Sequence, residues 1–251
     1  MIAILPVAGL PEIGDGTDLP SLLADHLAAH GPALQPGDVV VVTQKIVSKA
    51  EGRFVELGTI APSPEAEALA LDVGKDARLV ELVLRESQAV VRKARNVLIT
   101  RHRLGHVMAN AGIDASNIGS GREDWVLLLP QDPDASAARI SATLAARFGF
   151  APPVVINDSF GRPWRMGTVN VAIGLCGMPA VRDQRGETDR DGRVLQVTQP
   201  ALGDAVAAAA GLAMGEAAEG VPVAIVRGLD LSGPAQTAAT IVRPLGEDLF
   251  R

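Results

Sequence analysis

The apolar positions of this chain follow two patterns, short β-branched runs and longer stretches with helical spacing. Val39–Thr43 is a continuous β-branched run, and its lack of polar alternation predicts a strand buried on both faces. Leu19–Leu27 carries leucines at helical spacing behind Thr17-Asp18 and Pro20. We therefore expect a capped amphipathic helix there, ending at Gly31-Pro32.

The rest of the chain continues this alternation of helix and strand. Helices are predicted to begin at Ser63-Pro64, Asp76 and Asp132-Pro133, where capping side chains stand, and another covers residues 201–214. Strands are predicted over residues 1–6, 97–100, 126–129, 195–197 and 221–226. This order favours an α/β or α+β architecture. Because no repeat or low-complexity linker divides the chain, we expect one domain over residues 1–251, in which any second subdomain is an insertion.

Polar side chains follow directly on the apolar run Val154–Ile156. Asp158 and Ser159 interrupt the run, and a glycine and a proline come soon after, so the strand is predicted to end there. Asp158 beside Ser159 offers adjacent oxygen ligands of the kind Mg²⁺ or Mn²⁺ takes, while Arg162 and Arg165 offer donors for phosphate or carboxylate. Taken alone, the same residues fit an ordinary surface turn with ion pairs equally well.

Composition narrows the class of protein. The chain has 251 residues, of which 47% are hydrophobic and 21% charged, as in a soluble globular protein with a substantial core. Aromatic residues make up only 3%, with no tyrosine, so stacking platforms for single-stranded nucleic acid are not expected. A formal charge of −6 also argues against nucleic acid as a partner.

The sequence predicts a cytoplasmic protein with no membrane segment. A single cysteine, Cys176, excludes an internal disulfide and fits a reducing compartment. The first residues carry no basic region and are interpreted as a strand rather than a signal peptide. The apolar stretch over residues 201–220 is interrupted by Asp204, Glu216 and Glu219, so we expect a helix of a soluble protein.

The common catalytic fingerprints are missing from the chain. There is no P-loop, no G-x-S-x-G elbow, and Gly119-Ser120-Gly121 does not continue into a dinucleotide motif. His102 and His106 are four apart but lack the glutamate of a zinc motif, and Cys176 lies in a small apolar stretch typical of packing. What remains is a set of oxygen ligands and basic groups near the ends of apolar runs, which together indicate a polyanion site with metal: Lys45, Lys49, Asp114, Asn117, Asp158, Ser159 and Glu216.

Several long motifs occur in the order found in one family. They are Gly9–Glu12, Val41–Gly52, Asn110–Asn117, Asp158–Arg165, Asn170–Gly174, Met214–Glu216 and Pro222–Gly228. In these motifs the chain resembles the coenzyme F420-0:γ-glutamyl ligases. The resemblance implies an α+β fold of mixed and antiparallel sheets with flanking helices, working as a homodimer. It also implies a GTP-dependent reaction that joins L-glutamate to F420-0 and, in many members, extends a γ-linked glutamate tail, assisted by two divalent cations, Mg²⁺ or Mn²⁺.

Carried over by motif, the resemblance implies roles for particular residues. Asp114 and Asp158 would hold one cation, with Ser159 and Glu216 contributing to the second, and Asp158 is the residue we most expect to be essential. No general base can be named. The GTP site would be lined by Leu10, Pro11, Glu12, Ile13, Gln44, Lys45, Lys49, Asn117, Met214, Gly215 and Glu216.

The chain departs from the family pattern at three positions. Gln44 stands where relatives often have a small hydroxyl residue, Ser159 where threonine is common, and Met166 where a polar residue is usual. Serine keeps a hydroxyl ligand, whereas Gln44 would alter contacts to the nucleotide. Two other functions stay open at this point: a ligase acting on a different phosphorylated carboxylate, and a non-catalytic F420-binding protein.

Overall fold

A mixed five-stranded sheet forms the centre of the molecule. The structure is a computed structural model that describes residues 1–249. The strand order is β1-β10-β2-β8-β9, in which β2 and β8 run parallel and every other pair is antiparallel. These strands are β1 (Ala3–Val7), β2 (Val39–Thr43), β8 (Val154–Arg162), β9 (Arg165–Cys176) and β10 (Val223–Arg227).

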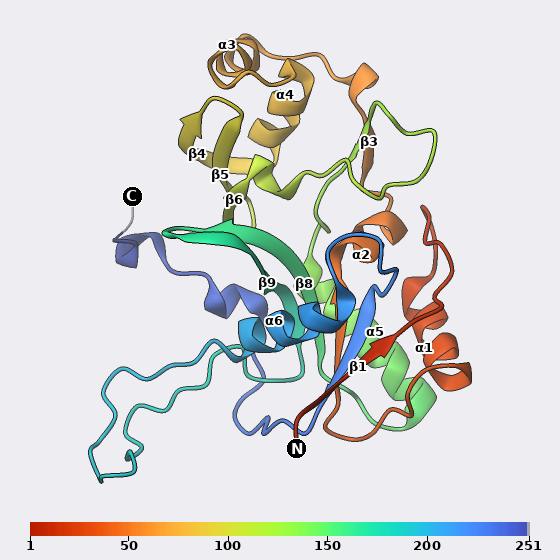
Figure 1. Cartoon of the computed structure of the whole chain (residues 1–251), viewed down its shortest axis with the longest axis vertical. Coiled ribbons are helices and arrows are strands. Elements are labelled where there is room, and N and C mark those ends of the chain that lie inside the picture. The colour runs from red at the N-terminus through yellow and green to blue at the C-terminus, as the bar shows by residue number, and fades with distance from the viewer. Residues whose placement is uncertain (250–251) are drawn as a thin grey trace.

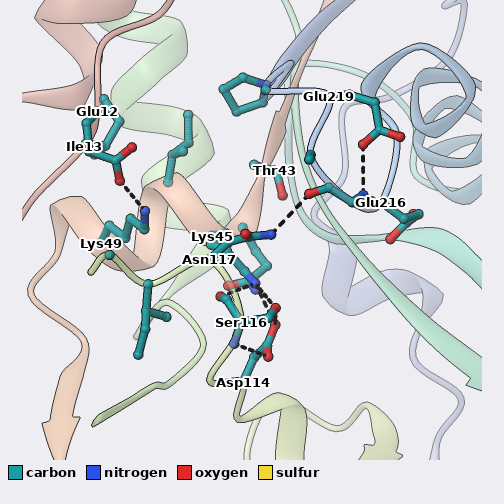
Figure 2. A pocket seen from close by; sticks show the side chains of 18 of the residues that line it. Glu12, Ile13, Thr43, Lys45, Lys49, Asp114, Ser116, Asn117, Glu216 and Glu219 are labelled. Atoms are coloured by element: carbon teal, nitrogen blue, oxygen red, sulfur yellow. Dashed lines mark hydrogen bonds and ion pairs between the residues drawn. The ribbon is translucent and has the colours of Figure 1, made fainter. Parts of the chain in front are cut away.

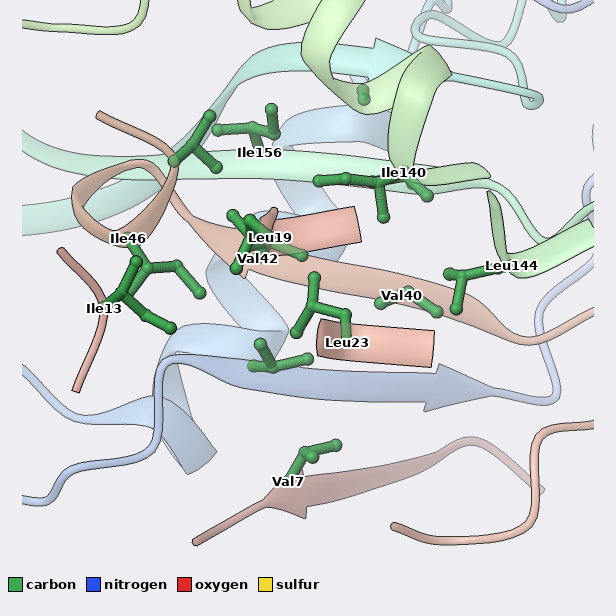
Figure 3. Close-up of a cluster of buried hydrophobic side chains, with 14 of the residues drawn as sticks. Val7, Ile13, Leu19, Leu23, Val40, Val42, Ile46, Ile140, Leu144 and Ile156 are labelled. Atoms are coloured by element: carbon green, nitrogen blue, oxygen red, sulfur yellow. The ribbon is translucent and has the colours of Figure 1, made fainter. Parts of the chain in front are cut away.

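Helices cover both faces of this sheet (Figure 1). α1 (Leu19–Ala29), α2 (Gln44–Ala50) and α5 (Pro133–Phe148) lie on one face, and α6 (Leu202–Met214) lies on the other. The position of β2 between two helical layers accounts for its run of valines. Val40 and Val42 pack toward α1 and α5 (Figure 3), while Val39 and Val41 pack toward α6. All four valines are fully buried, as the missing polar alternation predicts.

Residues 54–127 add two small sheets and a third cluster of buried side chains. β3 (Phe54–Glu56) pairs with β7 (Trp125–Leu127), and β4 (Ser87–Ala94), β5 (Val97–His102) and β6 (Val107–Ala109) form a three-stranded sheet. α3 (Pro64–Val73) and α4 (Ala77–Arg85) pack against them. The predicted α+β class is confirmed. The expectation of one domain over 1–251 with an inserted subdomain stays a prediction.

Four predicted helix starts, those of α1, α3, α4 and α5, are correct because each has a side-chain cap. Asp18 accepts a hydrogen bond from the Ser21 amide at 3.2 Å, and Ser63, Asp76 and Asp132 accept comparable bonds from amides two or three residues ahead. A short polar side chain before the first turn satisfies amides that lack a partner within the helix. This local chemistry is readable without knowledge of the fold.

Three strand predictions are corrected. β8 does not end at Asp158 but runs to Arg162, where it turns into β9 through a hairpin. Cross-strand bonds to β9 keep the polar residues extended, which outweighs their turn propensity. Residues 195–197 form no strand, since only an isolated bridge between Thr188 and Val194 occurs there. The strand predicted over 126–129 lies at Trp125–Leu127.

The charged segment over residues 182–200 projects from the body as a long loop (Figure 1). Its two arms are joined by backbone hydrogen bonds, such as Arg182 N to Pro200 O at 2.9 Å and Gln184 N to Thr198 O at 3.0 Å. Over residues 1–249, no helix combines the length and the apolar character needed to cross a bilayer.

The ion pair between Arg227, the last residue of β10, and Asp38, directly before β2, tests how much a buried charge pair stabilises the fold. Arg227 donates two hydrogen bonds of 2.7 Å to Asp38, whose side chain is 1% exposed. We expect Arg227→Met to lower the free energy of unfolding by about 3 kcal/mol, because a buried carboxylate loses its partner. Urea denaturation measures this loss. Arg182→Met, which breaks the exposed pair with Asp230, should cost less than about 1 kcal/mol; equal losses would contradict the argument.

Candidate functional site

A large cleft opens at one edge of the central sheet. The register places Thr43 beside Asn157 and Val42 beside Val223, so three segments meet at this edge: the start of α2, the polar part of β8 and the loop before β10. Residues 114–123 line the cleft as well. Its volume is about 1290 Å³, large enough for a nucleotide together with a second substrate.

The cleft brings together every residue that the family resemblance implies. The predicted nucleotide residues, from Leu10–Ile13 through Gln44, Lys45, Lys49 and Asn117 to Met214–Glu216, all line it, as do the four predicted cation ligands. Arg162, Arg165 and Met166 do not line it and belong to the β8–β9 hairpin tip. Sequence spacing alone could not reveal this convergence. The roles of the lining residues stay predictions.

Lys45 holds Asp114 on one side of the cleft (Figure 2). Its ammonium nitrogen lies 2.6 Å from Asp114 Oδ2 and also donates to the carbonyl and hydroxyl oxygens of Ser116, at 2.8 and 2.9 Å. Ser116 in turn donates its amide and hydroxyl to the same carboxylate, each at 2.8 Å. Although burial acts to raise it, these bonds hold the pKa of Asp114 below its usual range.

A second lysine of α2 contacts a different wall. Lys49 is 2.6 Å from Glu12 (Figure 2), whose side chain is largely exposed while the lysine is buried. Gln44 reaches the cleft but is 5% exposed, and its Oε1 accepts a hydrogen bond of 2.9 Å from the Ser48 hydroxyl. The amide of Gln44 is therefore engaged inside α2, and this is the local consequence of having glutamine at that position.

Asp158 and Ser159 point to opposite faces of the sheet. Successive side chains of a strand alternate, and the neighbours agree: Phe160 packs with the α1 and α5 side, whereas Val155 packs with the α6 side. Asp158 thus faces the side that holds α2. Ser159 faces α6 and donates its hydroxyl to Glu216 Oε2 at 2.7 Å. The expected adjacent ligands are separated into two groups, one on each face.

Asp158 carries the most perturbed carboxyl group of the cleft. Burial, above all, raises its pKa to about 7; the charges of Asp114 and Glu216 add to the rise, while the Ser159 amide and Lys45 oppose it. A buried carboxyl group with two further carboxylates close by is a common feature of sites that bind a cation or share a proton.

The loop after α6 closes another side of the cleft. Gly215 has φ +73°, a backbone conformation that favours glycine, and a Cβ there would displace the Glu219 side chain. Glu219 accepts a hydrogen bond of 2.8 Å from the Ala217 amide, and Asn117 donates to the Ala217 carbonyl at 3.2 Å. This second contact ties the loop to the opposite wall of the cleft (Figure 2).

The donor set fits a divalent cation by its chemistry. Asp114, Asp158, Ser159 and Glu216 offer only oxygen, which Mg²⁺ and Mn²⁺ prefer. Burial is the main cause of the raised pKa of Asp158, and a cation would offset the lesser contribution from the charges of Asp114 and Glu216. Within residues 1–249, no three His, Cys, Asp or Glu side chains are already gathered around one point. Lys45 takes an oxygen of Asp114 instead. Binding a cation there requires these side chains to shift.

The stability of the ligand-free protein should depend on pH through Asp158. Its folded-state pKa, about 7, lies above the ordinary 3.8. The ionisation of Asp158 therefore costs no stability below about pH 4, and this cost grows as the pH rises toward 7. Asp158→Asn removes this dependence. Urea denaturation with chelator present should show the variant gaining on the wild type between pH 5 and 8, by on the order of 2 kcal/mol once partial exposure is discounted. A constant difference would contradict the shift.

Sequence reasoning gave no role to several polar residues of the cleft, among them Ser116, Asn170 and Glu219. Ser116 bonds to both Lys45 and Asp114, and Asn170 donates to Glu216 Oε1 at 2.5 Å. Asn170 had a readable signal, because it is a lone amide directly before the apolar run Val171–Ile173. Ser116 and Glu219 lie in loops of small and polar residues, where nothing distinguishes a lining residue from a solvated one.

The other candidate groups lie outside the cleft. Cys176 packs against the α1 and α5 side of the sheet, and burial raises the pKa of its thiol, which disfavours the thiolate. His102 is fully buried, with Nε2 3.4 Å from Glu86. Burial, with the charge of His102, lowers the pKa of His106 to about 4. These side chains fill the interior rather than face a substrate.

The fold and the cleft together are those of an α+β enzyme whose site is lined by charged and polar groups. Residues 9–228 match the family model described as F420-0:Gamma-glutamyl ligase, and the chain belongs to this family of ligases. It is 42% identical to the coenzyme F420:L-glutamate ligase of Methanothermobacter thermautotrophicus, over 100% of this chain and 99% of that protein. Identity is 43% to the ligase of the same name from Methanopyrus kandleri, over 100% and 98%, and 44% to that from Natronomonas pharaonis, over 89% and 85%.

Proposed function

We propose that this chain joins L-glutamate to the carboxylate of coenzyme F420-0, with GTP as the phosphoryl donor and divalent cations as cofactors. The main support is the convergence, in one cleft of a family member, of paired carboxylates with two lysines. Relatives that span nearly the whole chain carry the name coenzyme F420:L-glutamate ligase. Extension into a γ-linked tail is part of the proposal.

The reaction we propose has two transfers. A carboxylate oxygen of F420-0 attacks the γ-phosphorus of GTP, the bond to the β-phosphate oxygen breaks, and GDP leaves with that electron pair. The product is an acyl phosphate. The glutamate amine then attacks its carbonyl carbon, an amide bond forms, inorganic phosphate leaves, and the ammonium proton passes to a base or to water. Hydroxide is a poor leaving group, which is why the carboxylate needs activation.

In this scheme the protein acts by position and charge rather than as a nucleophile. Lys45 and Lys49 would neutralise phosphate oxygens, and the loop over residues 214–220 would enclose the nucleotide. Two cations, held by Asp114 with Asp158 and by Ser159 with Glu216, would supply further neutralisation of the transferring phosphoryl group. The separation of Asp158 from Ser159 across the sheet fits two cation positions better than one.

One assay tests substrate, reaction and chain length together. Purified protein is incubated with F420-0, L-glutamate, GTP and Mn²⁺, and the products are weighed by mass spectrometry. We expect F420 carrying one or more added glutamates, GDP formation that requires both acceptor and glutamate, and loss of both with EDTA. Omission of each substrate in turn is the control.

Two alternative functions have their own outcomes in this assay. GDP release only with a different phosphorylated carboxylate would indicate a ligase of other acceptor specificity. Tight binding of F420-0 without GDP would indicate a non-catalytic F420-binding protein, although the retained Asp114, Asp158 and Glu216 count against that. The homodimer and the cytoplasmic location stay predictions, and light scattering tests the first of them.

A further inference from the structure

Side chains of two neighbouring strands hydrogen-bond the two oxygens of the Glu216 carboxylate. Ser159 on β8 and Asn170 on β9 are direct cross-strand partners. The Ser159 hydroxyl donates to Glu216 Oε2 at 2.7 Å, and the Asn170 amide donates to Oε1 at 2.5 Å. Glu216 is an exposed residue directly after Gly215, at the start of the loop that follows α6, and its side chain would otherwise sample many rotamers. These two bonds fix one carboxylate plane.

Asn157, Asn170 and Glu216 form a chain of hydrogen bonds, and the carboxylate at its end fixes which group donates at each step. A carboxylate can only accept, so Asn170 must present its NH₂ group to Glu216 and its Oδ1 away from it. The Oδ1 of Asn170 accepts from Asn157 Nδ2 at 2.6 Å. Asn157 must therefore also present its NH₂ group outward. One orientation of both amides satisfies the chain, and the reverse orientation would place the Asn170 amide oxygen against Glu216 Oε1, which would then lack its donor.

Asn157, the donor to Asn170, lies in the interior of the protein. Its side chain is 1% exposed, and its Oδ1 has no hydrogen-bond partner among residues 1–249. Its Nδ2 has one further contact, the Met214 sulfur at 3.7 Å. A buried acceptor left unpaired destabilises the fold, and an apolar residue of similar size would avoid that cost. The donor of Asn157 is thus the part of the side chain with a structural use.

Helix α6 makes room for the same chain. A Cβ at Gly211 would lie 2.5 Å from Asn170 Nδ2 and 2.9 Å from its Cγ. Gly211 stands in the last turn of α6, where glycine is otherwise less favourable than alanine. The glycine lets the Asn170 amide pass beneath the helix to reach Glu216. Sheet and helix are therefore both adapted to one hydrogen bond.

We infer that Asn170, oriented by Asn157, is a positioning residue that aims the Glu216 carboxylate at a divalent cation. This inference rests on the metal dependence in the proposed function. Groups that hydrogen-bond a cation ligand from behind orient it, and their loss typically weakens cation affinity by roughly 10- to 100-fold. Asn170 touches no substrate in this scheme and acts only through Glu216.

The test measures Mn²⁺ affinity directly, by calorimetric titration in the presence of GTP and without the F420-0 acceptor. Asn170→Ala is expected to weaken Mn²⁺ binding by about 10-fold or more. Thr168→Ala, an exposed change two residues earlier on β9, is the matched control and should leave the affinity unchanged. In a Glu216→Ala background, Asn170→Ala should change the remaining affinity by less than about 2-fold, because its target is gone.

Gly211→Ala separates positioning from general stability. Alanine favours a helix over glycine, so the melting temperature should hold or rise, yet the displaced Asn170 amide should weaken Mn²⁺ binding several-fold. In the Asn170→Ala background the two closest contacts of the new methyl group are removed and only the Cβ of residue 170 remains, at 3.2 Å, so Gly211→Ala should then have no further effect on affinity. A purely structural role for Asn170 would not produce this pattern.

Wild-type affinity for Mn²⁺ in Asn170→Ala would overturn the inference. So would a wild-type chain that binds no Mn²⁺ with GTP present, because Glu216 would then have no cation to hold. Failure of the proposed function looks different: wild-type protein would bind Mn²⁺, and Asn170→Ala would weaken it, while no glutamate is added to F420-0.

Discussion

Asp158→Asn is expected to lower kcat/KM for glutamate addition by at least about 100-fold while the protein remains folded. The change removes one oxygen ligand and the negative charge at the centre of the cleft, where Asp114 and Glu216 act on the same group. Charge neutralisation of a transferring phosphoryl group contributes several kcal/mol to the barrier, and each 1.36 kcal/mol corresponds to about a tenfold change in rate.

Stability and activity should move in opposite directions in this variant. Above about pH 7 the buried Asp158 is ionised at a cost to the ligand-free fold, and asparagine removes that cost. Asp158→Asn should then be inactive but at least as stable as the wild type. An inactive variant that is also unfolded would carry no information, so this combination makes the experiment decisive.

The measurement is GDP release dependent on both F420-0 and glutamate, with urea denaturation run on the same samples. Asp204→Asn is the matched control. Asp204 is also partly buried with a raised pKa, but it accepts from the Ala172 amide and does not line the cleft. It should keep near-normal turnover. Near-normal turnover in Asp158→Asn would remove Asp158 from the cation site and from the proposed mechanism.

The elements that could be predicted from the sequence are those fixed by local chemistry. Asp18, Ser63, Asp76 and Asp132 cap helices because a short polar side chain before a first turn bonds the amides next to it. Val39–Val42 reads as a doubly buried strand because every side chain is apolar. Neither prediction depends on residues distant in the chain, and both are confirmed.

The end of β8 could not be predicted because it depends on a distant partner. Asp158 to Arg162 have turn propensity, and only pairing with β9 keeps them extended. The same pairing sets Ser159 opposite Asn170, so the contact of Asn170 with Glu216 was invisible as well. The order of the family motifs identified residues that line the cleft. That Asp158 and Ser159 lie on different faces of the sheet follows only from their alternation along β8.

Lys45→Met is expected to reduce kcat/KM for GTP by roughly 100-fold. In the ligand-free protein the ammonium group of Lys45 is satisfied by Asp114 and Ser116. We expect a nucleotide phosphate to compete for this group, which would release Asp114 to a cation. Loss of one charge-assisted contact to phosphate in the transition state amounts to about 3 kcal/mol.

The pattern of rates distinguishes this role from a structural one. If Lys45 contacts phosphate in the ground state, KM for GTP should rise, whereas a contact made only in the transition state would lower kcat with KM unchanged. Lys93→Met is the matched control, because Lys93 forms a pair of the same 2.6 Å length with Asp72 but does not line the cleft. Its exposed pair should cost less than about 1 kcal/mol of stability and leave both kinetic constants unchanged. Unchanged kcat/KM in Lys45→Met would mean that the ammonium group only tethers Asp114, and the phosphate would then have to be bound by Lys49 and the cations alone.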